Sequence, residues 1–294
     1  MRIARFKAEE REFYGIVDDQ MLSITTISPF NKCSAPQTIE ELISLSPESW
    51  NNIKEALEDQ EEIKKDAIYK LADVELLAPI VNPPKIICVG LNYHDHAAEQ
   101  DAEIPEEPII FMKPRTAITG PNKPIIKPEF VKKLDYEAEL AVVIGKKGKD
   151  ISVEEAKHYV FGYTILNDVS ARDIQFKDRQ WTRGKSFDTF APMGPYITTA
   201  NQIGNPNNLK IRTWVNGELR QDSSTKNMVF NVYEIIHHLS RVMTLELGDI
   251  IATGTPAGVG VFMKPEPKFL KPNDRITIEI EAIGKLENFV VESS

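Results

Sequence analysis

Residues 135–144 read DYEAELAVVI, in which acidic residues lead into an unbroken apolar run. The apolar half, residues 140–144, is short and rich in β-branched side chains, which is typical of a β-strand. The same pattern returns at residues 85–89, 211–215, 250–252 and 276–280. Many strands without a regular strand–helix alternation predict an α+β domain built around β-sheets.

A few short helices are expected between these strands. Ser152 with Glu155, and Asn231 with Glu234, have the spacing of N-terminal capping pairs. After Asn231 the apolar residues recur at helical spacing, namely Val232, Ile235, Ile236 and Leu239. The sequence therefore predicts one helix that begins near residue 152 and an amphipathic helix that begins near residue 231.

The chain is predicted to divide into a small N-terminal domain, residues 1–78, and a larger domain, residues 79–294. The boundary falls in residues 78–84, which read APIVNPP. Three prolines in seven residues resist both a helix and a central strand, so this segment is expected to be a linker.

The first domain shows strand-like stretches near residues 3–6 and 13–17. Two helix-start signals follow them: Thr38 with Glu41, and Ser46 with Pro47. No cluster of titratable residues stands out in this part of the sequence. We therefore expect a structural or interface role for it.

The composition excludes several classes of protein. The 294 residues carry 35 Lys and Arg against 44 Asp and Glu, a formal net charge of −9, which argues against a nucleic-acid binder. The first residues become charged before any apolar stretch, and the apolar runs fall far short of the ~20 residues of a membrane span. Two cysteines, Cys33 and Cys88, form no CxxC pair and fit a reducing compartment. A cytoplasmic protein without membrane or nucleic-acid partners is therefore expected.

The glutamates before the apolar run are the first candidates for chemistry. If the strand begins at or before Glu137, Glu137 and Glu139 share one face, about 6.5–7 Å apart along the backbone. Such a pair can converge on a cation, although an arbitrary ExE is more often a solvated polar face. A second strand ends in Asn167-Asp168, where Asp168 is either a third carboxylate or part of a turn. Three carboxylates without a nearby cysteine favour Mg²⁺ or Mn²⁺ over Ca²⁺.

Residues 90–99, GLNYHDHAAE, contain a possible acid–base pair. Asn92 is expected to cap a short helix, which would place His96 and Glu99 side by side. A histidine oriented by a carboxylate is the usual general base, here for water, because no Ser or Cys nucleophile signature is present. Two alternatives stay open: surface histidines on a loop, or a zinc pair formed by His94 and His96, which lacks further His or Cys ligands nearby.

Two loops complete the set of candidates. Lys185 lies among glycine, proline and aromatic residues, which would hold it more rigidly than the solvated surface lysine that is the competing interpretation. Residues 253–260, TGTPAGVG, follow a strand, and the N–H groups and threonine hydroxyls of such a turn can hold an anion. The segment lacks the lysine of a P-loop, and a plain tight turn is the alternative.

Five motifs, taken in order, resemble the fumarylacetoacetate hydrolase family. They are ICVGLNY (87–93) followed by His96, DYEAEL (135–140), NDVSARD (167–173), GKSFDT (184–189) and TGTP (253–256). The resemblance extends from about residue 85 to the end of the sequence. It implies a catalytic domain of the mixed β-roll type and a homodimer, with the first 78 residues as a short N-terminal extension.

The resemblance also implies roles for individual residues. It assigns Mg²⁺ or Mn²⁺ to Glu137, Glu139 and Asp168. It makes His96 and Glu99 a water-activating dyad, on a short helix that orders over the substrate.

The same resemblance implies a substrate site. Lys185 and Arg172 would contact the carboxylate or enolate of the substrate, and Thr255 would bind it from the far side. Gln175 falls where acylpyruvate-cleaving relatives carry a glutamine. The fumarylacetoacetate-cleaving branch has an extra metal-ligand aspartate upstream of the histidine, where this sequence has the apolar ICVG of residues 87–90. Smaller acylpyruvates or oxaloacetate are therefore favoured over fumarylacetoacetate.

The implied reaction is divalent-metal-dependent cleavage of a C–C bond in a small anionic 2-oxo acid through an enolate, by a hydrolase or an oxaloacetate decarboxylase. Three carboxylates, one divalent ion, Arg172 and Lys185 leave a pocket near +1, which can accept such an acid. Two alternatives remain. One is an isomerase of the 5-carboxymethyl-2-hydroxymuconate type, which needs only the base, and the other is a binding or regulatory protein that retains the fold.

Overall fold

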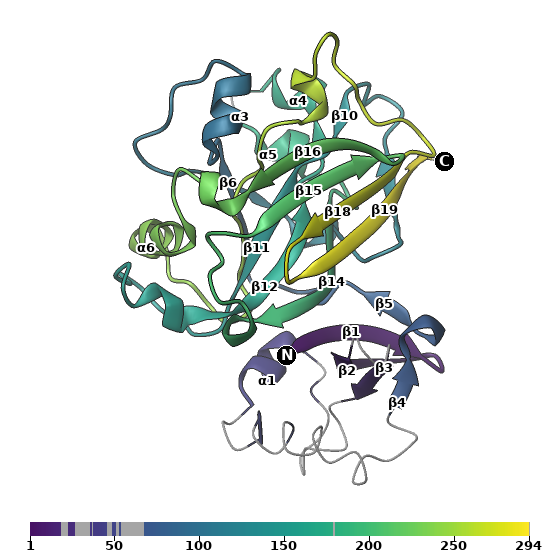
Figure 1. Cartoon of the computed structure of the whole chain (residues 1–294), viewed down its shortest axis with the longest axis vertical. Coiled ribbons are helices and arrows are strands. Elements are labelled where there is room, and N and C mark those ends of the chain that lie inside the picture. The colour runs from purple at the N-terminus through teal and green to yellow at the C-terminus, as the bar shows by residue number, and fades with distance from the viewer. Residues whose placement is uncertain are drawn as a thin grey trace.

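The computed structural model describes residues 1–18, 23–26, 36, 38–45, 49–50, 53, 68–178 and 180–293. Figure 1 shows a larger upper body rich in strands and a smaller lower body that contains the N-terminus. Strands outnumber helices throughout the described residues, and the helices are short. The predicted α+β class, built around β-sheets, is confirmed.

The larger of the two main sheets runs through both bodies. Its strands follow the order β4-β3-β2-β1-β14-β12-β11-β17-β6-β7. In that order they span Ile68–Lys70, Ser23–Thr26, Arg11–Asp18, Arg2–Ala8, Ala191–Thr199, Val160–Asn167, Ala138–Ile144, Ile250–Ala252, Ile86–Gly90 and Ile109–Lys113. Neighbours are antiparallel except β17 and β6, which are parallel. Two short strands lie off this path, β5 (Glu75–Leu77) beside β1 and β8 (Ile118–Thr119) beside β14.

A second sheet packs against the middle of the first. Its order is β16 (Glu218–Ser224), β15 (Lys210–Val215), β18 (Arg275–Ile280), β19 (Gly284–Glu292) and β9 (Pro124–Lys127). Strands β15, β18 and β19 contact β11, β12 and β14, respectively. The main core therefore lies between the two sheets. A separate pair of short strands joins β10 (Leu134–Asp135) to β13 (Ser170–Ala171).

Strand β11 is buried along its whole length. Leu140, Val142 and Ile144 belong to the core between the sheets, whereas Ala141 and Val143 belong to a second core on the opposite face. Fully burying an aliphatic side chain of this size stabilises the fold by about 1.5–3 kcal/mol. Apolar residues at every position of 140–144 are thus explained by burial on both faces of one strand.

The other predicted strands are found with small shifts. Residues 250–252 form β17, residues 211–215 and 276–280 lie inside β15 and β18, and residues 85–89 correspond to β6, displaced by one residue. In the lower body, residues 3–6 and 13–17 lie inside β1 and β2.

The amphipathic helix is confirmed as α6 (Val232–Val242). The Asn231 side chain accepts hydrogen bonds from the N–H groups of Tyr233 and Glu234, and the Glu234 carboxylate accepts one from the N–H of Asn231. The four apolar residues that predict this helix are all buried. The signal at Ser152 and Glu155 instead precedes a 3₁₀ turn, η5 (Ala156–Tyr159), because β12 begins at Val160 and leaves too few residues for an α-helix.

The remaining helices are short. They are α1 (Ile39–Ile43), α3 (His94–Glu99), α4 (Arg172–Gln175), α5 (Thr182–Lys185), and the 3₁₀ turns η3 (Leu71–Asp73), η4 (Arg115–Ala117), η6 (Ala200–Gln202), η7 (Thr225–Asn227) and η8 (Gly260–Phe262). Among the described residues, no helix combines the length and the apolar character that crossing a membrane requires.

The two bodies meet where β1 pairs with β14, through Arg2 opposite Thr198 and Ile3 opposite Ile197. Residues 78–85 contain neither helix nor strand, as expected of a linker. Thr38 caps α1 by accepting the N–H of Glu41. The second helix-start signal, Ser46 with Pro47, lies outside the described residues. The division into two domains stays a prediction.

Candidate active site

The predicted site residues gather at one end of the upper body. In Figure 1, α3, α4 and α5 lie together there, beside the ends of the central strands. Local hydrogen bonds explain the placement. Ala138 at the start of β11 pairs with Asn167 at the end of β12, so the residues just outside this pair, Glu137 and Asp168, are neighbours. The N–H of Asp168 donates to the carbonyl of Glu137 at 2.9 Å, and the Asn167 side chain accepts the N–H of Glu137 at 3.0 Å.

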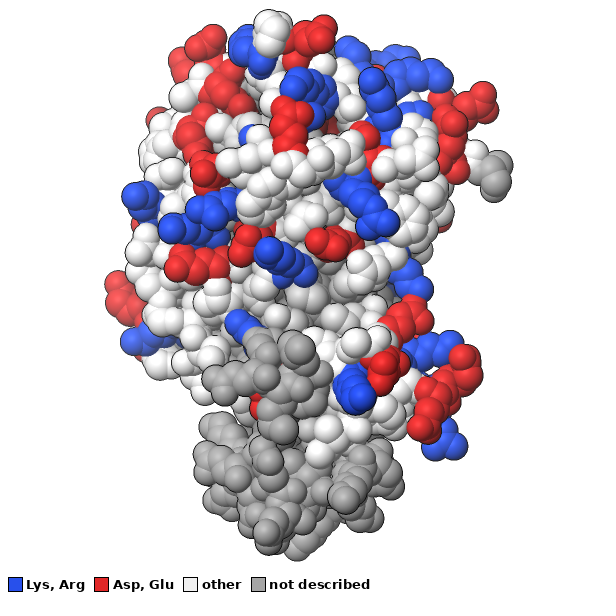
Figure 2. Space-filling view, turned by 45° about the vertical axis from the view of Figure 1, so that its right-hand side comes forward, with Lys and Arg blue, Asp and Glu red and all other residues white. Residues whose placement is uncertain are grey.

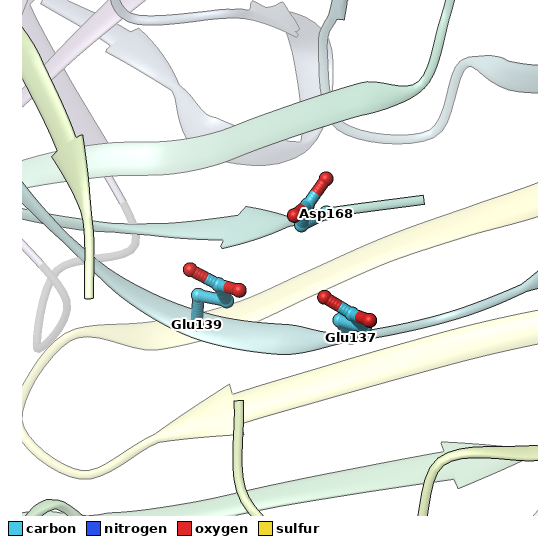
Figure 3. A group of neighbouring side chains, drawn as sticks. All are labelled: Glu137, Glu139 and Asp168. Atoms are coloured by element: carbon cyan, nitrogen blue, oxygen red, sulfur yellow. The ribbon is translucent and has the colours of Figure 1, made fainter. Parts of the chain in front are cut away.

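Three carboxylates converge at this point, as predicted. One oxygen from each of Glu137, Glu139 and Asp168 lies within 4.8 Å of the others, and all three residues are at most 5% exposed. Figure 3 shows the two glutamates on the same side of β11, with Asp168 opposite them. We call these residues the acidic triad. The strand itself begins at Ala138, so Glu137 joins the shared face from the residue before it.

Three buried cations accompany the acidic triad. Lys185 donates to Glu137 Oε2 and Asp168 Oδ2, both at 2.7 Å. Arg172 lies 2.6 Å from Glu137 Oε1, and Lys113 donates to Asp168 Oδ1. Acidic and basic side chains intermix on the surface in Figure 2, but here they are enclosed by the protein. Lys185 is therefore held rigidly, and the solvated-lysine interpretation is wrong.

The cluster shifts the pKa values of its members in opposite directions. Although burial alone would raise it, Lys185 and Arg172 lower the pKa of Glu137 to about 2. Burial, together with the charges of Asp168 and Glu137, raises the pKa of Glu139 well above its ordinary value. Burial opposes the charge of Lys185, but Asp168 and Glu137 raise its pKa to about 12. Glu139 is thus the carboxylate with the least compensation from the protein's own cations.

This donor set fits a hard divalent cation. Three carboxylate oxygens converge within 4.8 Å, without a cysteine among them, and oxygen ligands are those that Mg²⁺ and Mn²⁺ prefer. An added positive charge would offset the repulsion that keeps the pKa of Glu139 high. The acidic triad can therefore hold Mg²⁺ or Mn²⁺.

The predicted dyad is formed on α3. His96 Nδ1 lies 2.6 Å from Glu99 Oε1, and Glu99 Oε2 accepts the N–H of Gly258 at 2.9 Å. His96 is 7% exposed, whereas His94 is exposed, so the two histidines do not form a pair on one surface. An ionised carboxylate only accepts, so Nδ1 is the donor and Nε2 is left as the basic nitrogen.

The expected capping role of Asn92 is wrong. The residue at the N-cap of α3 is Tyr93, and it makes no side-chain cap. The Asn92 amide donates to the carbonyls of Phe230 and Thr253 at 3.0 and 2.7 Å, and its oxygen accepts the N–H of Phe230 at 2.8 Å. Asn92 therefore fixes three backbone groups around the site, and tertiary hydrogen bonds replace the local cap.

Two nitrogens of the buried Arg172 guanidinium are paired, and the third has no partner. Its Nε donates to Asp135 at 2.9 Å and its Nη1 to Gln175 at 3.0 Å. Its Nη2 is buried without a hydrogen-bond partner. A buried guanidinium nitrogen of this kind is suited to an anionic oxygen of a ligand. Asp135 also accepts the N–H groups of Gly260 and Val261, which anchors the loop after β17.

Most hydrogen-bond donors of the turn at residues 253–256 are bonded to other groups of the protein. The Thr253 hydroxyl donates to the carbonyl of Leu140, and the N–H of Gly254 donates to Glu139 Oε2 at 2.8 Å. The Thr255 hydroxyl accepts from the buried Gln221 at 2.8 Å and lines the cavity described next. The turn thus contributes Thr255 to the site and uses the N–H of Gly254 to orient the acidic triad.

One small cavity, of about 120 Å³, joins these groups. Its polar wall contains most of the predicted site residues, namely His96, Glu137, Glu139, Arg172, Gln175, Lys185 and Thr255, with Gln100. Its apolar wall is formed by Val89, Leu91, Ile109, Phe111, Phe176, Trp181 and Phe262, with Gly90. Of the predicted residues, Glu99 and Asp168 stand behind the wall, where they contact His96 and Lys185.

Three buried residues of the site were not singled out from the sequence. Lys113 follows an apolar strand and has no motif around it, so nothing local marks it. Asp135 lies in the quoted DYEAE stretch and could have been weighed as a fourth acid. Gln221 joins Thr255 to the N–H of Ala138, a bond between distant segments that no spacing reveals. Lys113 and Asp135 carry opposite charges, so the expected net charge of the pocket does not change.

The chain matches a known protein family and several known proteins. Residues 85–291 match the family described as fumarylacetoacetate (FAA) hydrolase, C-terminal. The chain is 47% identical over 260 residues to oxaloacetate tautomerase fahd2, mitochondrial, of Xenopus laevis, which covers 88% of this chain and 80% of the relative. It is 45% identical over 300 residues to oxaloacetate tautomerase YisK of Bacillus subtilis, which covers 98% of this chain and 99% of the relative.

One similar solved structure contains a metal ion and a small 2-oxo acid. Maleylpyruvate hydrolase from Sphingobium sp. SYK-6, in complex with manganese(II) ion and pyruvate, matches with a TM-score of 0.80. The identity is 32%, and the match covers 100% of both chains.

Proposed function

This chain belongs to the fumarylacetoacetate hydrolase family of enzymes, and we propose that it interconverts the enol and keto forms of a small 2-oxo dicarboxylic acid such as oxaloacetate. The observation that carries the proposal is that His96 of the dyad and the two glutamates of the acidic triad line one cavity, with Glu99 and Asp168 directly behind them. Tautomerisation needs an acid–base group beside a site that stabilises an enolate. The names of these two relatives, both oxaloacetate tautomerases, support this reaction.

The proton is moved by the dyad. Conversion of enol to keto removes one proton from the enol oxygen and adds one to carbon 3, so the reaction consumes neither water nor an oxidant. Nε2 of His96 is the nitrogen that takes and returns the proton, because Nδ1 is bonded to Glu99. Glu99 is itself held by the N–H of Gly258 and so fixes the orientation of the ring.

The remaining polar groups of the cavity bind and orient the acid. The free Nη2 of Arg172 offers a donor to a carboxylate, and the ammonium of Lys185 lies beside the same space. Thr255 offers a hydroxyl to the same cavity, and Gln221 fixes its position. Charged donors that are already in place stabilise developing negative charge without reorganisation.

Mg²⁺ or Mn²⁺ is the proposed cofactor, with the acidic triad as its site. When bound, such an ion supplies a Lewis acid that stabilises negative charge on the keto and carboxylate oxygens of the acid. The chemistry of the triad supports this choice, as does the manganese in the structure of the similar hydrolase. The role of the protein is to hold three oxygens in place and to keep three cations beside them.

Cleavage of a C–C bond in an acylpyruvate is the second candidate, and it is the reaction that the motif resemblance favours. The dyad geometry also suits activation of water, and the similar solved structure is that of a hydrolase with bound pyruvate. The size of the cavity weighs toward the smaller acid. About 120 Å³ lies below the roughly 300–1,000 Å³ of typical small-molecule sites.

A substrate panel separates these reactions. The protein is incubated with the enol of oxaloacetate, with acetylpyruvate and with a hydroxymuconate-type diene acid, each with Mn²⁺, with Mg²⁺ and with a chelator. Loss of enol absorbance is followed optically, and NMR identifies the products. Accelerated ketonisation without pyruvate supports the proposal. Pyruvate from acetylpyruvate or oxaloacetate selects cleavage instead, and a shifted double bond selects the isomerase.

Two histidine variants test the role of the dyad. His96→Asn removes the buried base, whereas His94→Asn makes the same change on an exposed residue of the same helix. A general base contributes about 10²–10⁴-fold. We expect a loss in this range for His96→Asn and none for His94→Asn. Equal activities of the two variants would exclude His96 as the proton carrier.

A further inference from the structure

The apolar wall of the cavity includes a close contact between an indole ring and a glycine. Trp181 lies at the start of the segment that carries Lys185, and its ring rests on the backbone of Gly90, the last residue of β6. A Cβ placed on Gly90 would lie 2.0 Å from Cζ3 of the indole. No side chain fits at residue 90 while the indole keeps this position.

The conformation of Gly90 does not explain why it is glycine. Six glycines of the chain have positive φ values, and Gly90 is not one of them. Its backbone would therefore accept an ordinary residue, and the constraint comes from space alone. Gly90 leaves room for the indole to lie against the strand that forms the floor of the cavity.

The indole is also held from a second side. Phe111 on β7 meets it edge-on, with ring centroids 5.7 Å apart and an interplanar angle of 75°. The ammonium of Lys185 lies 4.9 Å from the centre of the Phe111 ring. The contacts thus run from Lys185 to Phe111 and from Phe111 to Trp181, and all three residues line the cavity. Packed between Gly90 and Phe111, the indole forms a firm part of the apolar wall.

We propose that Trp181, seated on Gly90, limits the length of the 2-oxo acid that the cavity accepts, so that four-carbon diacids fit and longer ones are excluded. The inference rests on the proposed function in one respect, namely that a 2-oxo acid binds with its keto end at the acidic triad. The carbon chain of the acid beyond the keto group then passes along the apolar wall, where each added carbon would compete with the indole for space. Trp181 acts here as a specificity-determining residue and carries no proton.

The test measures affinity as a function of chain length. Binding of saturated 2-oxo dicarboxylic acids with four, five and six carbons is measured by calorimetry at a fixed Mn²⁺ concentration. The proteins are the wild type, Trp181→Ala, Trp181→Phe and Gly90→Ala. Trp214→Ala is the matched control, since Trp214 is also half-buried but lies on β15, away from the cavity.

A methylene group that does not fit a pocket changes discrimination by about 10–200-fold. We therefore expect wild type and Trp214→Ala to bind the six-carbon acid at least about 10-fold more weakly than the four-carbon acid. Trp181→Ala should bring the two affinities within about threefold, and Trp181→Phe should be intermediate. Gly90→Ala should also change the length preference, because the new methyl group displaces the indole.

Each outcome decides the inference. A wild-type length preference that survives in Trp181→Ala, or in Gly90→Ala, overturns it. If Trp181→Ala does not fold, Gly90→Ala and Trp181→Phe decide instead. If the wild type shows the length preference but does not accelerate ketonisation, the proposed function fails and the length limit stands. If ketonisation is found but the preference is the same in all variants, only the length limit fails.

Discussion

Replacing Glu139 by glutamine tests the metal site without depending on turnover. Glu139 is 1% exposed, and burial together with Asp168 and Glu137 raises its pKa well above the ordinary value of 4.5. Glutamine has nearly the same shape and removes the negative charge. We therefore expect Glu139→Gln to fold and to lose most of its affinity for Mn²⁺.

The size of the effect follows from linkage between binding and folding. Mn²⁺ at 100 times its Kd adds about 2.7 kcal/mol to the free energy of unfolding. A change of 1 kcal/mol moves the Tm of a large domain by roughly 2–4 °C, so the wild-type Tm should rise by about 5–10 °C. The same Mn²⁺ concentration should move the Tm of Glu139→Gln by less than about 1 °C. Scanning calorimetry with Mn²⁺ and with a chelator measures both values.

The raised pKa of Glu139 also predicts the sign of a pH effect in the metal-free protein. A carboxyl group that holds its proton more tightly in the folded state lowers the stability as the pH rises from its unfolded pKa through its folded pKa. Metal-free wild type should therefore lose stability over this range relative to Glu139→Gln, which has no proton to lose there. Urea unfolding at mildly acidic and mildly basic pH measures the difference.

Glu287→Gln is the matched control. Glu287 lies exposed on β19, so the same isosteric change removes a charge on a strand far from the acidic triad. This control should keep the full rise in Tm with Mn²⁺. A rise in Glu139→Gln as large as in the control would refute the assignment of the acidic triad as the metal site.

Three further predictions concern single contacts. Lys113→Met leaves Asp168 buried with one fewer cation and should lower the free energy of unfolding by about 3–5 kcal/mol. The same change at the exposed Lys157 should alter it by less than about 0.5 kcal/mol. Equal urea midpoints for the two variants would show that Lys113 is dispensable. Asn231→Ala removes the capping box of α6 and should lower the free energy of unfolding by about 1 kcal/mol, and an unchanged urea midpoint would contradict this. Asn92→Ala should cost more than that cap, at least about 2 kcal/mol by the same assay, because the buried carbonyl of Thr253 and two partly buried backbone groups of Phe230 lose their partner. A smaller loss than that of Asn231→Ala would contradict it.

The strands were predictable where one sequence segment determines the environment. Residues 140–144 are apolar at every position because alternate side chains face the core between the sheets and the others face the second core. The capping box of α6 was equally local, since Asn231 and Glu234 satisfy each other within one turn. In both cases the decisive interactions lie within a few residues of each other.

The acidic triad was predictable only in part from the residues themselves. Glu137 and Glu139 are brought together by the alternation of one strand, which can be read from their spacing. Asp168 joins them because Ala138 pairs with Asn167, and that register is a property of two strands rather than of either one. The order of the five motifs, and not the local pattern, predicted that Asp168 joins the two glutamates.

Asn92 shows why local rules fail near the site. An asparagine before a short helix has the residue type of an N-cap, but its amide is used for the carbonyls of Phe230 and Thr253, from two other parts of the chain. Lys113 was missed for the same reason. A lysine at the end of an apolar strand looks solvated in sequence, and only the pairing of β7 with β6 turns it toward Asp168.

Stability alone does not explain the charged cluster. Taking charges out of water costs several kcal/mol per ion, and well-packed apolar residues often replace a buried ion pair with equal or greater stability. The structure nevertheless encloses Asp135, the acidic triad and three cations next to a cavity, and leaves Nη2 of Arg172 without a partner. The proposed anionic substrate would give that nitrogen a partner. This would link the cost of burying the cluster to the proposed reaction.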